Sequence, residues 1–263
     1  MTTARGVALV TGGASGIGEA CARRFAQDGY RIAILDVNAA TAEAVAGDLG
    51  GPDDALWRIV DVSDHAAVDA AVNEVAEKWG RIDVCVASAG ILENASTVLD
   101  ADPEAHDRLW QVNYNGTVNT CRAVGKVMRA QKSGAMITLG SINSFVPLPL
   151  PAYCPSKTAI TRLTELLAVE LGRFNVRVNG LAPTYVLTPA LKARIESGDR
   201  DADLIKNSGV LDMFVMPADI ANAAAFLCSA QARAITGIML PVDAGHLAWT
   251  PYQNYAGGVP WQA

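Results

Sequence analysis

Short apolar runs alternate along the chain with longer segments in which apolar residues recur at helical spacing. The short runs have the length and composition of strands, and they lie at residues 7–11, 31–36, 56–60, 82–87, 135–139, 176–182 and 238–242. The longer segments predict helices at residues 17–27, 39–49, 64–79, 103–131, 153–174 and 218–229. Because such apolar strands have to be covered on both faces, the alternation predicts an α/β fold with a seven-stranded parallel sheet between two layers of helices.

Two segments depart from this alternation. Residues 184–215 combine Pro189 and Gly198 with a charged run, and we expect them to form a long loop that is functional or mobile. The end of the chain gathers four aromatic residues, Trp249, Tyr252, Tyr255 and Trp261. We expect this end to dock on another surface, although chain ends are usually disordered. The chain is therefore divided into one catalytic domain at residues 1–248 and an aromatic C-terminal tail at residues 249–263.

The composition predicts a folded protein of the cytoplasm. Hydrophobic residues make up 51% of the 263 residues and charged residues 18%, which is the opposite of a disordered composition. A net charge of −6 excludes a generally basic surface for nucleic acid. Neither a secretory leader nor an apolar run long enough to span a membrane is seen, so no membrane partner is expected. The five cysteines and three histidines show no metal-ligand spacing, and we expect buried, reduced thiols and no metal site.

A glycine-rich turn, residues 11–18 (TGGASGIG), separates the first predicted strand from the first helix. Gly12 permits a tight turn, Gly16 lets backbone N–H groups approach a pyrophosphate, and Gly18 lets the helix pack closely on the strand. Because a helix N-terminus attracts anions, the turn predicts a dinucleotide phosphate site. The spacing is not the commoner G-x-G-x-x-G, so a purely structural glycine turn stays open at this point.

Acidic residues follow the second and third predicted strands. Asp36 can accept hydrogen bonds from both ribose hydroxyls of an adenosine, and it would repel a 2′-phosphate. Neither Val37 nor the glycine turn offers a basic residue for that phosphate, so NAD is predicted rather than NADP. Asp61 and Val62 can bracket the adenine, or Asp61 is only an acidic residue before the next helix.

Tyr153 and Lys157 lie four residues apart and therefore on one face of a predicted helix. A phenol, with a pKa of about 10, is a poor base at neutral pH, but a neighbouring ammonium group lowers that pKa. The pair predicts proton transfer to or from a substrate hydroxyl. A tyrosine and a lysine that merely share a solvent-facing helix remain the alternative.

Taken together, these motifs resemble the short-chain dehydrogenase/reductase family over nearly the whole chain, up to about Ala248. The resemblance is carried by residues 11–18, Asp61-Val62, Ala89-Gly90, Val112-Asn113 with Gly116, Ser141, Tyr153 with Lys157, Val178-Asn179 with Pro183, and residues 235–237 with Val242-Asp243. It implies a single-domain Rossmann fold, a nicotinamide cofactor, hydride transfer without a metal, and a homotetramer.

The resemblance also implies roles for individual residues. Tyr153 would be the acid/base, and Ser141 would hydrogen-bond the substrate oxygen. Lys157 would bind the nicotinamide ribose, and Asn113 would kink the long helix and hold a water in a proton relay to Lys157. The expected cofactor contacts are Gly12, Ser15, Gly16, Ile17, Gly18, Asp36, Val37, Asp61, Val62, Ala89, Gly90, Tyr153, Lys157, Pro183, Val186 and Thr188.

The chain departs from the family pattern at three places. Ser88 stands where the family usually has Asn, and Thr184 where it usually has Gly. Ser141 and Tyr153 are 12 residues apart, one fewer than the family pattern, and three prolines lie between them. We therefore expect an unusual and stiff wall for the substrate cleft, with all catalytic groups retained.

The expected reaction is NAD-dependent interconversion of a secondary alcohol and a ketone. The candidate substrate residues are Asn143, Phe145, Tyr185, Met213 and Phe214. A sugar or polyol is favoured, because Asn143 and Tyr185, together with Asn94 or Glu93, can supply converging polar groups. A hydrophobic alcohol or ketone is the alternative. A non-catalytic NAD-sensing module is a second alternative, which the Tyr153/Lys157 pair argues against.

Overall fold

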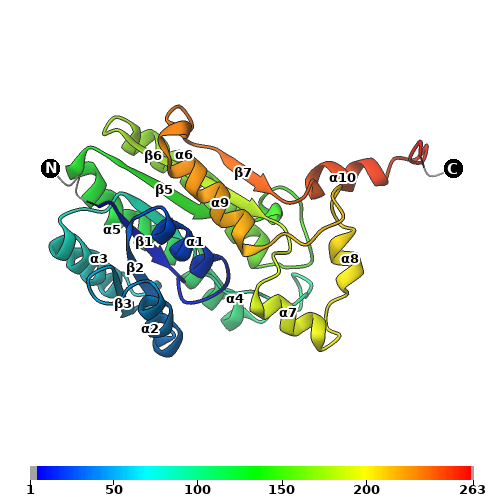
Figure 1. Cartoon of the computed structure of the whole chain (residues 1–263). Helices are drawn as coiled ribbons and strands as arrows, with labels where there is room; N and C mark the ends of the chain where they lie inside the picture. The colour runs from blue at the N-terminus through cyan, green and yellow to red at the C-terminus, as the bar shows by residue number, and fades with distance from the viewer. Residues whose placement is uncertain (1–4, 262–263) are drawn as a thin grey trace.

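A seven-stranded parallel sheet forms the centre of the computed structural model, which describes residues 5–261 (Figure 1). The strands are β1 (Val7–Thr11), β2 (Arg31–Asp36), β3 (Ala55–Ile59), β4 (Val84–Ala87), β5 (Gly134–Leu139), β6 (Val176–Pro183) and β7 (Met239–Val242). Their order across the sheet is β3-β2-β1-β4-β5-β6-β7, which confirms the expected α/β fold. Residues 1–4 and 262–263, the outer ends of the expected domain and tail, lie outside the described residues.

Alternate residues of each strand face opposite layers of helices. On β1, Ala8 and Val10 belong to one apolar core, whereas Val7 and Leu9 belong to another. The first core is covered by α1 (Gly16–Gln27), α2 (Ala39–Asp48) and α9 (Pro217–Cys228). The second is covered by α3 (His65–Trp79), α5 (Gly116–Gln131) and α6 (Tyr153–Gly172). Within residues 5–261, no helix combines the length and the apolar character that a membrane span requires.

The helix expected at residues 103–131 is interrupted. α4 (Pro103–Trp110) and α5 are joined by a π-helical turn, η1 (Gln111–Asn115). Such a turn inserts an extra residue into the helical hydrogen-bond ladder and bends the helix, often at a functional site. Asn113 lies inside this turn and is fully buried. The helix therefore changes its geometry at the residue where a kink is expected.

The segment expected to be one long loop contains two short helices, so that expectation is corrected. α7 (Pro189–Glu196) is capped by the Thr188 hydroxyl, which accepts a hydrogen bond from the Leu191 N–H. α8 (Ala202–Lys206) is capped by Asp201. Helices this short carry too few apolar positions for a clear period. Two 3₁₀ turns, η2 (Ile142–Ser144) and η3 (Ala230–Ala232), complete the connections.

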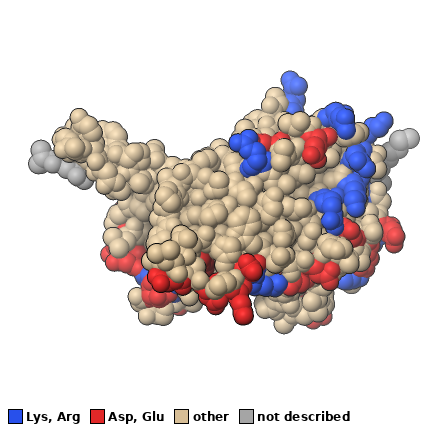
Figure 2. All heavy atoms as spheres, turned by 180° about the vertical axis from the view of Figure 1, so that it is seen from behind, with Lys and Arg blue, Asp and Glu red and all other residues tan. Residues whose placement is uncertain are grey.

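The aromatic tail forms a short helix that extends away from the sheet (Figure 1). None of the residues of α10 (His246–Gln253), all of them described, is buried. Trp249, Tyr252 and Trp261 stack on one another with ring centroids 5.4–6.5 Å apart. Seen from behind, the described part of the tail presents neither acidic nor basic side chains (Figure 2). The aromatic residues thus pack against each other, and their docking on another surface stays a prediction.

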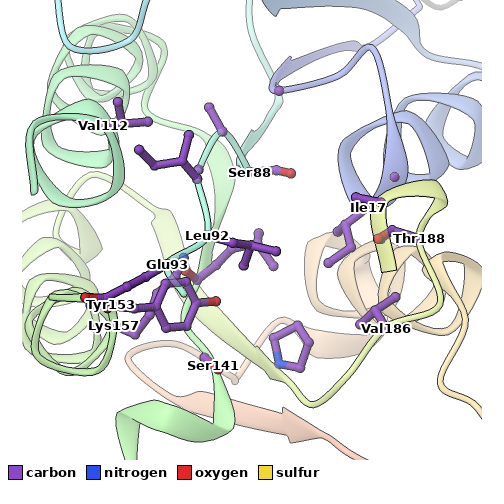
Figure 3. A pocket seen from close by; sticks show the side chains of 18 of the residues that line it. Ile17, Ser88, Leu92, Glu93, Val112, Ser141, Tyr153, Lys157, Val186 and Thr188 are labelled. Carbon is purple, nitrogen blue, oxygen red and sulfur yellow. Dashed lines mark hydrogen bonds between the residues drawn. The ribbon is translucent and has the colours of Figure 1, made fainter. Parts of the chain in front are cut away.

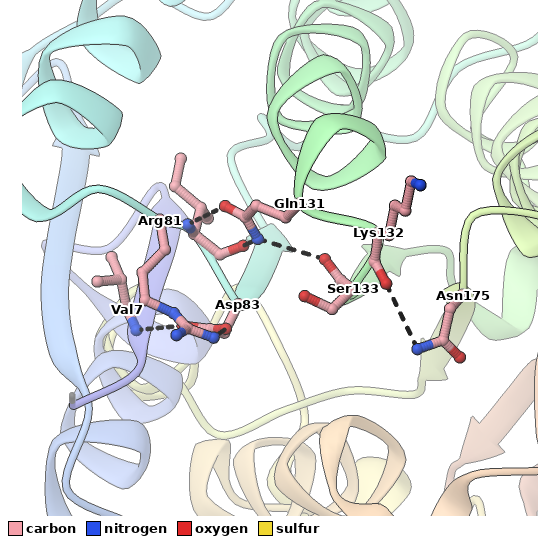
Figure 4. A network of polar contacts seen from close by, with 8 residues as sticks. Val7, Arg81, Asp83, Gln131, Lys132, Ser133 and Asn175 are labelled. Atoms are coloured by element: carbon pink, nitrogen blue, oxygen red, sulfur yellow. Dashed lines mark hydrogen bonds and ion pairs between the residues drawn. The ribbon is translucent and has the colours of Figure 1, made fainter. Parts of the chain in front are cut away.

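Polar contacts fix the amino-terminal edge of the sheet (Figure 4). The Asp83 carboxylate accepts a hydrogen bond from the Val7 N–H at 2.9 Å and is paired with Arg81. The Gln131 side chain binds both the N–H and the carbonyl of Ile82, at 2.7 and 2.8 Å. These contacts tie the start of β1 and the end of α5 to the approach to β4, at the edge away from the cleft.

The strand order opens a crevice at the opposite edge. β1 pairs with β2 on one side and with β4 on the other. β2 and β3 lie on one side of β1, and β4 follows on the other side. The connections after β1 and β4 therefore leave the sheet in opposite directions. Between them lies the space in which the candidate site is found.

Gly18 provides a test of the close contact between α1 and the glycine turn. A Cβ atom at this position would lie 2.1 Å from the Gly12 carbonyl oxygen, so the backbone has to move. We expect Gly18→Ala to lower the free energy of unfolding by about 2 kcal/mol or more, measured by urea denaturation. Gly47→Ala is the matched control, because nothing lies within 4 Å of its added Cβ. Near the end of α2 this exchange should stabilise by about 0.5 kcal/mol, and equal effects of both variants would contradict the packing argument.

Candidate active site

A cavity of about 700 Å³ opens at the carboxyl ends of β1 to β6 (Figure 3). All the residues expected to contact the cofactor line it, from the glycine turn after β1 to Thr188 before α7. Tyr153, Lys157 and Ser141 line the same cavity. The fold therefore brings together side chains that are spread over most of the sequence.

The glycine turn delivers the N-terminus of α1 to the cavity. The Gly12 N–H donates to the Leu35 carbonyl at 2.8 Å, which holds the turn against β2. Gly16 has a φ of +56°, and a Cβ added there would lie 3.2 Å from Thr188. Ser15 precedes the helix without capping it through its side chain, within the described structure. The open N–H groups of the first turn and the bare backbone at Gly16 fit a diphosphate.

Asp36 lies at the end of β2, beside the glycine turn. One carboxylate oxygen accepts a hydrogen bond from the Ala14 N–H and the other from the Asn38 N–H, both at 3.0 Å. The side chain is thus fixed at the edge of the cavity with its negative charge facing the turn. A carboxylate at this position fits recognition of the adenosine ribose hydroxyls and would repel a 2′-phosphate on that ribose.

The Asp61 carboxylate accepts more hydrogen bonds than its position in the sequence predicts. It accepts hydrogen bonds from the N–H and hydroxyl of Ser63, at 2.9 and 2.7 Å, and from the Arg108 guanidinium at 2.8 Å. The Ser63 hydroxyl and Arg108 lower the pKa of Asp61 to about 2. Arg108 comes from α4, and it also lines the cavity. Sequence analysis missed this arginine because no local motif marks it.

Tyr153 and Lys157 occupy the first two turns of α6, with Ser141 facing them (Figure 3). The Lys157 ammonium nitrogen lies 5.4 Å from the centre of the Tyr153 ring and donates a hydrogen bond to the Leu139 carbonyl at 2.7 Å. Burial lowers the pKa of Lys157 to about 8. Burial also raises the pKa of Tyr153 to about 12, and its hydrogen bond with Ser141 acts in the opposite direction. A phenolate at this position therefore needs positive charge nearby.

Asn113 lies behind the cavity wall and not on its surface. Its side-chain oxygen accepts from the Ile91 N–H at 2.8 Å, and its amide group donates to the Ile91 carbonyl at 3.0 Å. A Cβ added at Gly90 would lie 3.2 Å from the Asn113 oxygen and 3.9 Å from the Lys157 nitrogen. Asn113 thus holds the loop after β4 against Lys157, and its expected role in a water relay stays a prediction.

The candidate substrate residues separate into two groups. Asn143 and Tyr185 line the cavity, whereas Phe145, Met213 and Phe214 are absent from its described lining. The Asn143 side chain is buried, and its oxygen accepts a hydrogen bond from the Ser141 hydroxyl at 2.9 Å. Glu93, Thr184 and Arg194 also line the cavity. Arg194 lies on the short helix α7 and has no local pattern that would reveal it. The substrate roles of all five candidates stay predictions.

Comparisons with known proteins agree with this arrangement. The family model described as enoyl-(acyl carrier protein) reductase matches residues 12–246. D-threitol dehydrogenase of Mycolicibacterium smegmatis is 41% identical over 242 residues, which cover 91% of this chain and 92% of that protein.

Two solved structures show the same fold with different cofactors. NAD⁺-bound xylitol dehydrogenase superposes with a TM-score of 0.85 at 28% identity, covering 91% of this chain and 98% of that chain. ElxO with NADP bound has a TM-score of 0.88 at 27% identity, with coverages of 93% and 99%. The fold alone therefore does not decide between NAD and NADP, and the choice depends on the side chains at the site.

The buried Lys157 generates a prediction on stability. From about pH 8 to the ordinary lysine pKa of 10.5, Lys157 in the unfolded chain binds a proton that it has released in the folded chain, so the contribution of Lys157 to the free energy of unfolding rises with pH across this window. Lys157→Met removes the buried charge, and we expect it to raise the free energy of unfolding at pH 7 by about 2 kcal/mol. Urea denaturation at pH 7 and pH 9.5 should show this gain shrinking at the higher pH.

Lys192→Met is the control for this measurement. The Lys192 side chain is 67% exposed, so its replacement should give the same small effect at both pH values. A Lys157→Met variant that is less stable than the wild type at pH 7 would contradict the burial argument.

Proposed function

Since the chain belongs to the short-chain dehydrogenase/reductase family, we propose that it oxidises a secondary alcohol of a polyol to a ketone with NAD⁺. The observation that carries this proposal is the convergence of Tyr153, Ser141 and Lys157 in a cavity whose other end is bounded by the glycine turn and Asp36. A nicotinamide dinucleotide bound there would supply the hydride acceptor. The residues expected to hold it are the sixteen cofactor contacts predicted from the sequence, all of which line the cavity.

The protein side chains carry the proton part of the reaction. Ser141 Oγ holds the substrate oxygen, and Tyr153 Oη takes the hydroxyl proton as the alcohol is oxidised. The Lys157 ammonium lies 5.4 Å from the phenol ring, where its positive charge would act against the burial that disfavours the phenolate. Because the site is buried, this electrostatic support is stronger than it would be in water. In the reverse direction, the same phenol returns the proton to the ketone oxygen.

The preference for NAD rests on the charge beside the adenosine ribose. The Asp36 carboxylate is fixed by two backbone N–H groups and would repel a 2′-phosphate. Val37 follows it with an apolar side chain that is 65% exposed. The Arg108 guanidinium, which also lines the cavity, is already paired with Asp61.

The polyol assignment rests on polar groups in the cavity and on similarity. Ser141 and Tyr185, both with hydroxyl groups, are among the residues that line the cavity. The similarity to D-threitol dehydrogenase points to the same substrate class. A hydrophobic alcohol is the second candidate, and it is favoured by the apolar side chains of Leu92, Leu148 and Leu150 in the same lining. A non-catalytic NAD sensor is disfavoured, because such a protein has no use for a buried lysine beside a tyrosine.

We also propose a homotetramer in the cytoplasm. Leu166 and Val169 on α6 are 53% and 80% exposed, and Phe226 on α9 is 43% exposed, which provides apolar area for subunit contacts. All five cysteines are free thiols, as expected in a reducing compartment. The aromatic tail adds a further uncharged surface that could reach a neighbouring subunit.

Tyr153→Phe tests the reaction. We expect wild-type protein to produce NADH, measured at 340 nm, with NAD⁺ and members of a panel of C4–C6 polyols, in preference to terpenoid or aliphatic alcohols. Tyr153→Phe should lower kcat by about 1,000-fold while the affinity for NADH is kept, because only the proton acceptor is lost.

Tyr30→Phe is the matched control, since Tyr30 packs on Phe25 away from the cavity. It should keep wild-type kinetics. Unchanged turnover by Tyr153→Phe would refute the assigned role, whereas higher kcat/KM for hydrophobic alcohols would establish the second candidate.

Asp36 tests the cofactor preference. The double variant Asp36→Ala/Val37→Arg should change the ratio of kcat/KM for NAD to that for NADP by about 100-fold in favour of NADP. Asp36→Asn isolates the charge, because it keeps an oxygen that can accept the Ala14 N–H. Its ratio should lie between those of the wild type and the double variant, and an unchanged ratio in both variants would contradict the argument.

A further inference from the structure

A carboxylate from a distant loop caps the helix that carries the catalytic pair. Both oxygens of Glu93 accept hydrogen bonds from the Ala152 N–H, at 3.1 and 3.2 Å. One of them also accepts from the Tyr153 N–H at 2.8 Å. Glu93 follows β4, lines the cavity, and lies next to Tyr153 (Figure 3). The main-chain nitrogen of the tyrosine is thus held by a residue 60 positions earlier in the chain.

α6 lacks a cap of its own. The first N–H groups of a helix have no partner within the helix, and a preceding Ser, Thr, Asn or Asp usually supplies one. Here the preceding residue is Ala152, whose side chain cannot accept a hydrogen bond. The connection from Ser141 to α6 is short and contains Pro147, Pro149 and Pro151. It places Ala152, which has no capping side chain, directly before the helix. The acceptor has to come from another part of the fold.

The loop that supplies Glu93 is itself fixed on both sides. Ile91 is held by two hydrogen bonds to the Asn113 side chain. The Ser96 N–H donates to the Pro149 carbonyl at 3.0 Å. Glu93 lies between these two anchor points, so its carboxylate is a rigid brace and not a flexible surface group. Its hydrogen-bonding capacity is directed to α6, which removes it from the set of free polar groups for a polyol.

We propose that Glu93 is a positioning residue for Tyr153. Its carboxylate fixes the first turn of α6 and thereby sets the place of the phenol against Ser141 and Lys157. Small displacements of a reacting group are costly for catalysis, because a shift of about 1 Å can lower the rate by about 100-fold. This inference rests on the proposed role of Tyr153 in proton transfer.

Two variants of the 263-residue protein test the inference. Glu93→Ala removes the cap, whereas Glu93→Gln keeps one acceptor oxygen. We expect kcat with the best alcohol of the panel to fall about tenfold in Glu93→Ala and less in Glu93→Gln, with KM for alcohol and for NAD⁺ within about twofold of wild type. The deuterium isotope effect on kcat, measured with alcohol deuterated at the carbinol carbon, should rise as the chemical step becomes limiting.

Asp64→Ala is the matched control. Asp64 caps α3 through the Ala66 and Ala67 N–H groups, at 2.9 and 3.1 Å, and it does not belong to the cavity lining. Its replacement should affect stability and leave kcat, KM and the isotope effect unchanged. If the two Glu93 variants behave like this control, Glu93 is an ordinary helix cap and the inference is wrong. If KM for the alcohol rises while kcat is kept, Glu93 binds substrate and the inference is likewise wrong.

A readout without turnover separates this inference from the proposed function. Hydrogen–deuterium exchange of a peptide covering residues 149–157 should be faster in Glu93→Ala than in wild type, with little change in peptides from α3. Unchanged exchange would overturn the brace whatever the activity. Faster exchange in Glu93→Ala, found together with a wild-type protein that oxidises no alcohol of the panel, would keep the brace and refute the proposed reaction.

Discussion

The pairing of β1 with β4 is the constraint on which the site depends. The register places Thr11 opposite Ala87, so the two strands end together and their loops diverge from the same point. At that point the backbones nearly touch, since a Cβ on Gly12 would lie 2.8 Å from the Ala89 Cα atom. The glycine turn and the loop that carries Gly90 and Glu93 therefore pack together as one unit. Through Asn113 and the N-terminus of α6, this unit extends to Tyr153.

The site is unfavourable for the folded state in several ways. Lys157 is buried and, among the described residues, donates to one acceptor, the Leu139 carbonyl, and Tyr153 is placed where its ionised form is disfavoured. The glycine turn leaves helix N–H groups open, and a large cavity interrupts packing at the sheet edge. Two apolar cores that enclose every strand from both sides compensate for these losses.

Sequence patterns predicted the sheet and the residues that line the cofactor end of the cavity, because both have local signatures. The apolar period places the strands, and the spacings of the glycine turn and of Tyr153 and Lys157 are short. The missed features depend on contacts between distant segments. Arg108 meets Asp61 across 47 positions, and Glu93 reaches α6 across 60. α7 and α8 are too short for a visible period. The kink at Asn113 is expected, but only from the family resemblance and not from helix propensity.

The tail divides the molecule into two parts that respond differently to salt. Asp243 is the last Asp, Glu, Lys or Arg of the sequence. The net charge of −6 therefore belongs to the segment before α10. Ions screen contacts between charged surfaces, and at 1 M salt the screening length is about 3 Å. Contacts of the tail, with Tyr255 and Trp261 each about two-thirds exposed, are apolar and gain strength in sulfate. Ionic strength therefore weakens contacts of the acidic body with basic partners and reduces the repulsion between its own copies, while it favours contacts made through the aromatic end.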